Sequence, residues 1–163
     1  TYMLKLLGEL LTGECEDSYT NPHMERGKAL EAEARDLYAF HRGVEPQLVG
    51  FIKNGPKGCS PDSLIGANGM FETKAKLSHL HLDVLLRNRL PPEHVAQCQG
   101  GLWVAEREWI DFCSYRPKLP LFVIRAYRDE AYIKNLASEV DRFLDEMNDL
   151  MAKVSDYTIA EAA

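Results

Sequence analysis

The stretch Gly58–Lys76, GCSPDSLIGANGMFETKAK, has the most informative pattern in the chain. Its glycine-rich centre, residues 66–69, predicts a hairpin turn. The flanking residues 58–65 and 70–76 are rich in strand-forming side chains and predict the two arms of that hairpin. A turn of this kind brings the two arms side by side, so polar side chains on both arms can meet.

An acid lies toward the end of the first arm, and an acid and a lysine lie on the second. Because side chains alternate along a strand, Glu72 and Lys74 point to one face, and the hairpin can return that face beside Asp62. Two carboxylates at one end of a sheet offer hard oxygen ligands for Mg²⁺, and the Thr73 carbonyl could add another. A lysine beside the metal can orient or deprotonate a water. Turn chemistry at Pro61 and an exposed ion pair explain the same residues, and taken alone the pattern favours that explanation.

A long amphipathic helix is predicted over residues 22–42. At about 100° per residue, Glu31 lies at the edge of its buried stripe, between Met24 and Tyr38. A carboxylate at a core boundary needs a partner. Arg35, one turn on, is one candidate, and a metal shared with the hairpin carboxylates is the other. From the helix alone the ion pair is favoured.

Another helix is predicted from Pro91-Pro92 to about Glu106. It is largely apolar but carries Gln97 and Gln99, and a buried glutamine can bond the backbone or orient a water or a phosphate oxygen. Each glycine of Gly100-Gly101 lowers the stability of the helix by about 1 kcal/mol, and close packing against a neighbouring element is one explanation for their presence.

The remaining segments complete a mixed sheet with helices packed on it, an α/β (α+β) fold. The predicted strands are 47–53, 109–115 and 121–127, and the predicted helices are 2–12, part of 77–89, and one that follows the cap Asp129. Because there is no internal repeat or long linker, we expect one domain over residues 1–163. The first residue is threonine, so we expect the natural N-terminal segment to be missing.

The charge is unevenly distributed along the 163 residues, whose net charge is −6. Residues 51–128 carry 11 Lys and Arg against 7 Asp and Glu, whereas both ends are acidic. The total argues against a general nucleic-acid binder, but the basic middle keeps a DNA partner open. No stretch approaches the roughly 20 apolar residues of a membrane span, so no membrane partner is expected. The four cysteines form no CxxC pair, which predicts free thiols in a reducing, cytoplasmic compartment.

Three further features are predicted to be structural. His79 and His81 lack further zinc ligands at a suitable spacing and are expected on the surface or on a helix face. Cys59 has no paired histidine and is expected to be a small core residue. Trp103 and Trp109 are expected in the core.

Taken together, five segments resemble the lambda exonuclease / YqaJ-like viral recombinase family of the PD-(D/E)XK nuclease superfamily. They are an acidic helix, an SPD strand end, an E-x-K strand, a glutamine helix and two following strands. The resemblance covers about residues 2–150, and its segments are Met24–Tyr38, Cys59–Leu64, Glu72–Lys74, Ala96–Val104, and Trp109–Arg116 with Phe122–Asp129.

The resemblance implies a nuclease-like core, a central mixed β-sheet flanked by helices, and a role for each matching residue. The implied metal ligands are Asp62, Glu72 and the Thr73 carbonyl, with Glu31 completing or supporting the site. Lys74 would position the attacking water and Gln97 would orient water, lysine or phosphate, whereas Gln99 would be a packing neighbour. Ser60 and Lys76 would contact DNA phosphates.

The implied activity is Mg²⁺-dependent 5′-to-3′ digestion of one strand of linear double-stranded DNA to 5′-mononucleotides, for phage-type homologous recombination. The implied cofactor is a pair of Mg²⁺ ions, with Mn²⁺ as a substitute. The implied partners are DNA ends, two further copies in a homotrimer, and a single-strand annealing protein, in a bacterial host or encoded by a prophage. A structure-specific or nicking endonuclease, or an inactive nuclease-fold DNA-binding module, remains open.

The sequence departs from the family pattern in several places, which include Thr73 and Ala75-Lys76. Ser63 stands where glycine is usual, and the N-terminal segment that carries a pocket for the 5′-phosphate of the DNA is absent from these 163 residues. The sequence therefore does not indicate how that phosphate is held.

Overall fold

The computed structural model describes residues 2–15 and 22–157, with the backbone alone for 22–26. The predicted cap of the second helix, Asn21, lies outside the described residues. The chain forms two compact units, Thr20–Ile133 and Thr1–Tyr19 with Lys134–Ala163. The interpretation of residues 1–163 as one nuclease domain stays a prediction.

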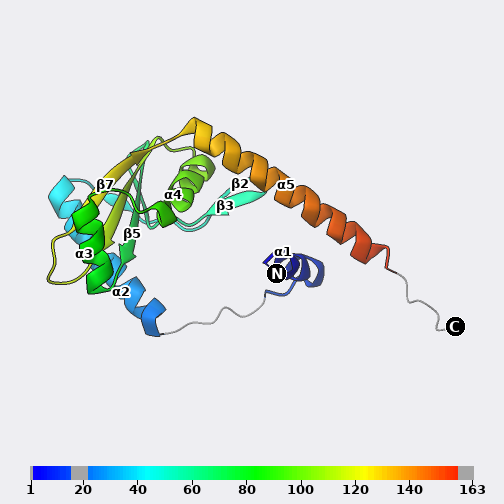
Figure 1. Ribbon diagram of the computed structural model, residues 1–163, viewed down its shortest axis with the longest axis horizontal. Coiled ribbons are helices and arrows are strands. Elements are labelled where there is room, and N and C mark those ends of the chain that lie inside the picture. The colour runs from blue at the N-terminus through cyan, green and yellow to red at the C-terminus, as the bar shows by residue number, and fades with distance from the viewer. Residues whose placement is uncertain (1, 16–21, 158–163) are drawn as a thin grey trace. The chain divides into compact units, whose positions relative to one another are not determined.

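The larger unit is built on a five-stranded mixed sheet of order β1-β4-β5-β6-β7 (Figure 1). Only β5 and β6 are parallel, and the other neighbours are antiparallel. A parallel pair needs a long crossover, which α3 and α4 supply here. The bounds are β1 Pro46–Gln47, β4 Ser63–Ile65, β5 Gly69–Ala75, β6 Trp109–Tyr115, β7 Phe122–Tyr127, α2 Pro22–Arg42, α3 Ser78–Arg87 and α4 Pro92–Ala105. The predicted mixed sheet flanked by helices is confirmed.

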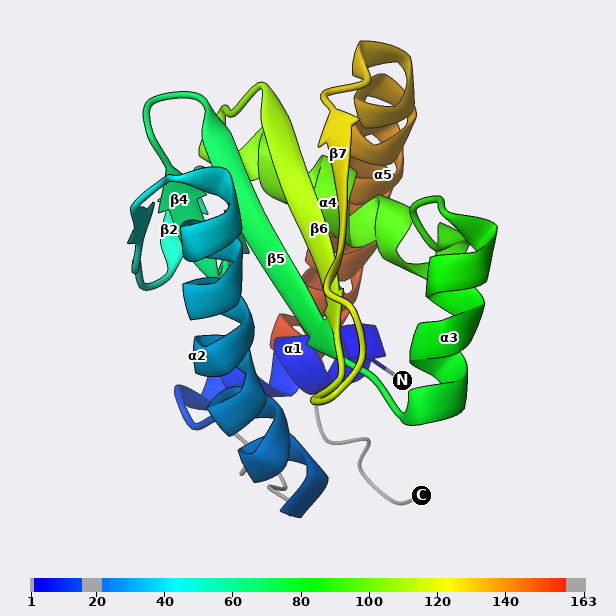
Figure 2. The same cartoon turned by 90° about the vertical axis from the view of Figure 1, so that its left-hand side faces the viewer.

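Helices cover both faces of this sheet, with α2 over one face and α4 over the other (Figure 2). The alternation along β5 decides which core each side chain joins. Met70 packs with Leu102 of α4, and Phe71 packs with Tyr38 of α2 at a ring-centroid distance of 4.4 Å. Glu72 and Lys74 follow Met70 in this alternation and therefore point to the α4 side.

Two of the predicted strands are wrong in extent. The predicted strand 47–53 is two short strands, β1 and β2 (Ile52–Asn54), because β1 pairs with β4 in the main sheet whereas β2 pairs with β3 (Lys57–Cys59) in a separate two-stranded sheet. The predicted arm 58–65 is interrupted at residues 60–62 between β3 and β4. Pro61 has no N–H for a ladder there, and the interruption sets Asp62 in a loop.

The predicted hairpin turn is confirmed, since Ile65 pairs with Gly69 across it. Gly66 adopts a φ of +54° at the start of this turn, which lets the chain reverse between β4 and β5. The fully buried hydroxyl of Ser63, at the start of β4, donates a hydrogen bond to the Asp62 carbonyl at 2.5 Å.

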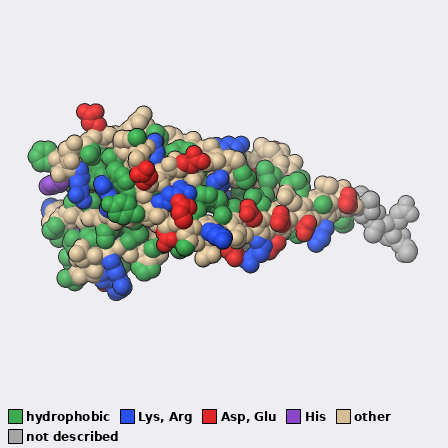
Figure 3. All heavy atoms as spheres, turned by 90° about the horizontal axis from the view of Figure 1, so that it is seen from above, with side chains coloured by type: hydrophobic (Ala, Val, Ile, Leu, Met, Phe, Trp, Pro, Cys, Tyr) green, Lys and Arg blue, Asp and Glu red, His purple; other side chains and the backbone are tan. Residues whose placement is uncertain are grey.

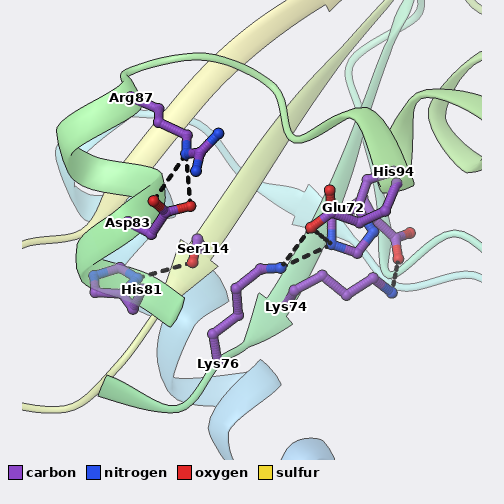
Figure 4. Close-up of polar contacts among 9 residues, drawn as sticks. Glu72, Lys74, Lys76, His81, Asp83, Arg87, His94 and Ser114 are labelled. Carbon is purple, nitrogen blue, oxygen red and sulfur yellow. Dashed lines mark hydrogen bonds and ion pairs between the residues drawn. The ribbon is translucent and has the colours of Figure 1, made fainter. Parts of the chain in front are cut away.

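Both histidines lie on helix α3, as predicted, with His79 exposed and His81 on the face that packs against the sheet. The His81 ring is fully buried, with Nδ1 2.8 Å from Ser114 Oγ and Nε2 2.9 Å from the Pro120 carbonyl (Figure 4). It fastens α3 to the sheet. The partners belong to β6 and the loop after it, so the histidine spacing alone could not identify them.

The smaller unit contains α1 (Tyr2–Thr12) and most of α5 (Glu130–Ser155). Each helix buries an apolar side chain, Leu7 and Met147, and the rings of Tyr2 and Phe143 lie 6.3 Å apart. The predicted cap of α5 is confirmed, because Asp129 Oδ1 accepts a hydrogen bond from the Tyr132 N–H at 3.0 Å.

Acidic and basic side chains lie side by side along α5 (Figure 3). Arg142 pairs with both Glu139 and Glu146. The acidic surplus of this helix is thus partly balanced within the helix itself. Among the described helices, none is both long enough and apolar enough to cross a bilayer.

Candidate active site

The centre of the candidate site is the Glu72 carboxylate on β5. Glu72 is only 5% exposed, and its Oε1 accepts hydrogen bonds from Lys74 Nζ and Gln97 Nε2, each at 2.6 Å. Figure 4 shows Lys74 pointing at Glu72 from the same strand. The predicted shared face of Glu72 and Lys74 is confirmed, and α4 brings Gln97 to the same oxygen.

Asp62 lies in the loop between β3 and β4, half-buried beside β5. Its Oδ2 accepts a hydrogen bond from the Thr73 N–H at 2.6 Å, which locks the loop against the strand. Burial raises the pKa of the Asp62 carboxyl, against the lowering effect of this hydrogen bond and of Lys74. Burial also raises the pKa of Glu72, and the negative charge of Asp62 raises it further.

Glu31 lies half-buried on α2. Burial raises the pKa of its carboxyl, the charge of Asp62 raises it further, and Lys74 and Arg35 lower it. Asp62 is therefore within electrostatic reach of both Glu31 and Glu72. Arg35, the alternative partner from the sequence, acts on Glu31 electrostatically but does not cancel the effect of burial.

The donor set fits a hard cation. Within residues 2–15 and 22–157, no group of three or more His, Cys, Asp and Glu side chains is arranged to hold a metal ion. Mg²⁺, however, typically takes one or two protein carboxylates and fills its remaining positions with water and substrate phosphate. Asp62 and Glu72 are such a pair, and a cation between them would offset the repulsion that raises the pKa of Glu72.

A cavity of about 330 Å³ adjoins Glu72 and Gln97. Ser60 and Pro61 form part of its wall, and the glycine pair of α4 forms another part. A Cβ built on Gly101 would lie 3.1 Å from Met70 Cε, so the predicted close packing is confirmed at this glycine. The cavity thus combines a polar end at Glu72 with a wall of backbone and apolar side chains.

The sequence also matches a known family. The profile of the YqaJ-like viral recombinase domain matches residues 1–108. The chain belongs to this family. No curated protein sequence matched the chain.

Solved structures agree with the family. The chain is similar to the alkaline exonuclease LHK-Exo from Laribacter hongkongensis, with 32% identity over 94% of this chain and 81% of that one and a TM-score of 0.85. The complex of LHK-Exo with dAMP gives 34% identity, the same coverage and a TM-score of 0.86. A phage-related exonuclease from Haemophilus somnus 129PT shares the fold at 14% identity, with 94% and 82% coverage and a TM-score of 0.70.

In this YqaJ-like chain, Lys76 lies near the site but contacts residues of α4 and not Glu72. Its Nζ is 3.0 Å from His94 Nε2 and 3.4 Å from Glu93 Oε1 (Figure 4). The His94 ring stacks on Phe112 at a centroid distance of 5.0 Å, and burial and the Lys76 charge lower its pKa. The sequence analysis did not identify His94, since no local spacing links it to Lys76.

Gln99, two positions after Gln97, has a structural role, as the family resemblance implies. It is buried, donates to the Tyr127 carbonyl at 2.9 Å and accepts from the Asp129 N–H at 2.9 Å. It therefore links α4 to the end of β7 and the start of α5. The two glutamines therefore have different roles, because Gln97 bonds to Glu72 whereas Gln99 bonds to the backbone of Tyr127 and Asp129.

The cysteines and tryptophans are mostly as predicted. The four cysteines are free thiols. Cys59 is half-buried rather than fully in the core, and burial raises its pKa, which disfavours a nucleophilic thiolate. Trp103 and Trp109 are half-buried, with Lys57 Nζ 4.8 Å and Arg125 Cζ 3.5 Å from their ring centroids.

Much of the positive charge in the middle of the chain is engaged within the fold. Arg125 pairs with buried Asp111, Arg107 donates to the Gly66 carbonyl at 2.8 Å, and Arg128 donates to the Leu102 carbonyl at 2.8 Å. These side chains hold strands, turns and helices together. The excess of basic over acidic residues in 51–128 therefore overstates the positive charge that is available to bind DNA.

Proposed function

We propose that the protein is a Mg²⁺-dependent exonuclease that digests one strand of linear double-stranded DNA from its 5′ end. The observation that carries this proposal is the buried Glu72 carboxylate, held by Lys74 and Gln97 and repelled by Asp62, at the wall of a cavity. Family membership and the likeness to alkaline exonucleases support the same activity.

Asp62, Glu72 and the Thr73 carbonyl are the proposed ligands of Mg²⁺, which Mn²⁺ can replace. Glu31 is proposed to support a second ion from the α2 side, because its carboxyl senses the charge of Asp62. When bound, the metal polarises the scissile phosphate and lowers the pKa of a bound water. Carboxylate oxygens suit this ion, and the two ligands come from adjacent loop and strand.

Lys74 and Gln97 are proposed to position the reactants. A lysine ammonium has three N–H donors and a glutamine amide has two, and the Glu72 bond uses one of each. The remaining donors can hold the attacking water and a phosphate oxygen. Ser60, on the cavity wall, and Lys76, directly after the end of β5, are proposed to contact neighbouring phosphates.

The proposed hydrolysis determines the product. The water oxygen bonds to phosphorus, the P–O3′ bond breaks, and the 3′ oxygen leaves with a proton. The terminal nucleotide is released as a 5′-mononucleotide and the next nucleotide retains a 5′-phosphate. A homotrimer around the duplex and a single-strand annealing partner belong to the same proposal and rest on the family resemblance.

The test uses 5′-phosphorylated linear duplex, with Mg²⁺ or with EDTA, for the wild-type protein and Asp62→Ala. We expect 5′-mononucleotides only from the wild type with Mg²⁺. Activity that survives in Asp62→Ala would refute the site assignment. Cleavage of covalently closed circular duplex would instead favour an endonuclease, and tight binding of linear duplex without cleavage would favour an inactive DNA-binding module.

A further inference from the structure

The β2–β3 hairpin has two different faces. Its inner face points to α4, where Asn54 Nδ2 donates to the Val104 carbonyl at 3.0 Å and Cys59 Sγ lies 4.0 Å from the Gly101 carbonyl. The outer face carries Lys53 and Gly58, and the residues just before β2 and just after β3, Phe51 and Ser60, are exposed as well. An aromatic ring, an ammonium group, bare backbone and a hydroxyl therefore share one open face.

Phe51 is the unusual member of this face, because it is 69% exposed. Its ring occupies the space where a side chain of Gly58 would be, and a Cβ built on Gly58 would lie only 2.0 Å from Phe51 Cζ. Glycine at this position thus lets the ring lie against the strand. The ring therefore lies against the hairpin while most of it stays open to solvent.

The strand beneath the ring also forms part of the wall of the candidate active site. Gly58 and Ser60 line the same cavity as Glu72 and Gln97, and Asp62 follows two residues after Ser60. Single exposed apolar residues are common and need no function. Phe40, 83% exposed on α2, is such a case, since its ring contacts only His41 among the described rings. Phe51 differs by its contact with the cavity wall and its basic neighbour Lys53.

We propose that Phe51 stacks on an unpaired base of the DNA strand that is being digested, with Lys53 adding positive charge beside the strand's phosphates. This inference rests on the proposed exonuclease function and names how the substrate strand is held near the cut. Every base has a π face, so such a contact is tolerant of sequence, which suits a nuclease that digests strands of any sequence. The hairpin leads directly from this ring to Ser60 and Asp62.

The test compares digestion kinetics of the wild type, Phe51→Ala and the matched control Phe40→Ala. Base–aromatic stacking of the usual strength predicts that Phe51→Ala raises KM about tenfold, with kcat changed less than about twofold. Phe40→Ala should match the wild type. Gly58→Ala provides a second test, because the added Cβ displaces the Phe51 ring while the backbone stays in a conformation open to alanine.

A modified substrate separates stacking from a structural role. Duplexes with an abasic nucleotide at the first, second or third position of the digested strand lack one base each. At the stacked position, the wild type should lose the same factor of about ten, and Phe51→Ala should lose nothing further. Equal KM values for Phe51→Ala and Phe40→Ala on intact DNA would overturn the inference while leaving the proposed function intact.

The inference can also be judged if the proposed function fails. In that case the wild type leaves linear duplex undigested, and the fluorescence of Phe51→Trp is followed as a single-stranded oligonucleotide is added. Stacking predicts quenching beyond that seen with Phe40→Trp, which controls for the two native tryptophans. Equal quenching in the two variants overturns the stacking proposal.

Discussion

Two buried carboxylates on neighbouring strands differ in how their charge is balanced. Asp111 on β6 is fully buried on the α2 side of the sheet, and Arg125 reaches both of its oxygens at 2.8 Å while Tyr38 donates at 2.7 Å. Glu72 on β5 is buried on the α4 side. Its one cationic partner, Lys74, also acts on Asp62, and the negative charge of Asp62 acts on Glu72.

The difference indicates which cluster is structural and which is functional. The guanidinium of Arg125 matches the charge of Asp111 with a bidentate pair, and nothing is left over for a ligand. Around Glu72 the balance differs, because Lys74, which bonds to Glu72, also acts on Asp62 and Glu31, and burial raises the pKa of all three acids. Buried acids with raised pKa values, one of them in a cavity wall, are a feature of functional sites.

The largest expected effect is on catalysis, through Glu72→Gln. Loss of a metal ligand removes several kcal/mol of transition-state stabilisation, so kcat/KM with Mg²⁺ should fall at least about 10³-fold. The free energy of unfolding should stay equal or rise, because a buried charge is removed. Digestion assays and urea unfolding measure the two quantities. A large loss of stability would place Glu72 in the same class as Asp111.

Asp111→Ala should give the opposite result. It leaves the Arg125 guanidinium and the Tyr38 hydroxyl without their buried acceptor, so unfolding free energy should fall by about 3–5 kcal/mol. Activity per folded molecule should be near that of the wild type, as measured at a temperature where the variant is folded. Tyr38→Phe is the milder control, with an expected loss of about 1 kcal/mol. Normal stability in Asp111→Ala would contradict the comparison.

The two glutamines of α4 repeat the comparison on one helix. Gln97→Ala removes a donor beside the reacting groups and should lower kcat about 10²-fold with little change in stability. Gln99→Ala leaves the Tyr127 carbonyl and the Asp129 N–H unpaired, so it should cost about 1–3 kcal/mol of stability with kcat retained. If the two variants exchange these effects, the assignment of Gln97 to the site is wrong.

Metal addition should give the smallest effect. A cation that binds the native protein at about five times its Kd stabilises it by about 1 kcal/mol. The melting temperature of the wild type should therefore rise by a few degrees with Mg²⁺ and return with EDTA. Asp62→Ala should show no rise. Phe40→Ala, altered on an exposed side chain away from the acids, should respond like the wild type.

Local chemistry predicted much of the fold. The helix over residues 22–42, the α4 start at Pro91-Pro92 and the turn at residues 66–69 depend on Pro, Gly and near-neighbour periodicity, and each lies where the sequence places it. The strand 47–53 failed because its two ends pair with different partners. A local pattern indicates that a segment can be extended, but not which strand it will meet.

In the candidate site, too, some features follow from the local sequence and others do not. The shared face of Glu72 and Lys74 follows from alternation along one strand, whereas the place of Gln97 came from family resemblance and not from spacing. The contact of His94 with Lys76 was not predicted, because no local sequence pattern links the two residues. The pair Asp111 and Arg125 did have a sequence signal, since an acid and a base lie on two consecutive predicted strands. Their Cα positions pair directly across β6 and β7.

The sequence by itself determined the order of Asp62, Glu72 and Lys74 along one hairpin and the face that the last two share. Only the tertiary structure decided that Asp111 acquires a guanidinium while the acids around Glu72 stay in excess. The physical reason is that alternation and turn formation act between near neighbours, whereas the neutralisation of a buried charge depends on strand register and helix packing between residues far apart in the chain.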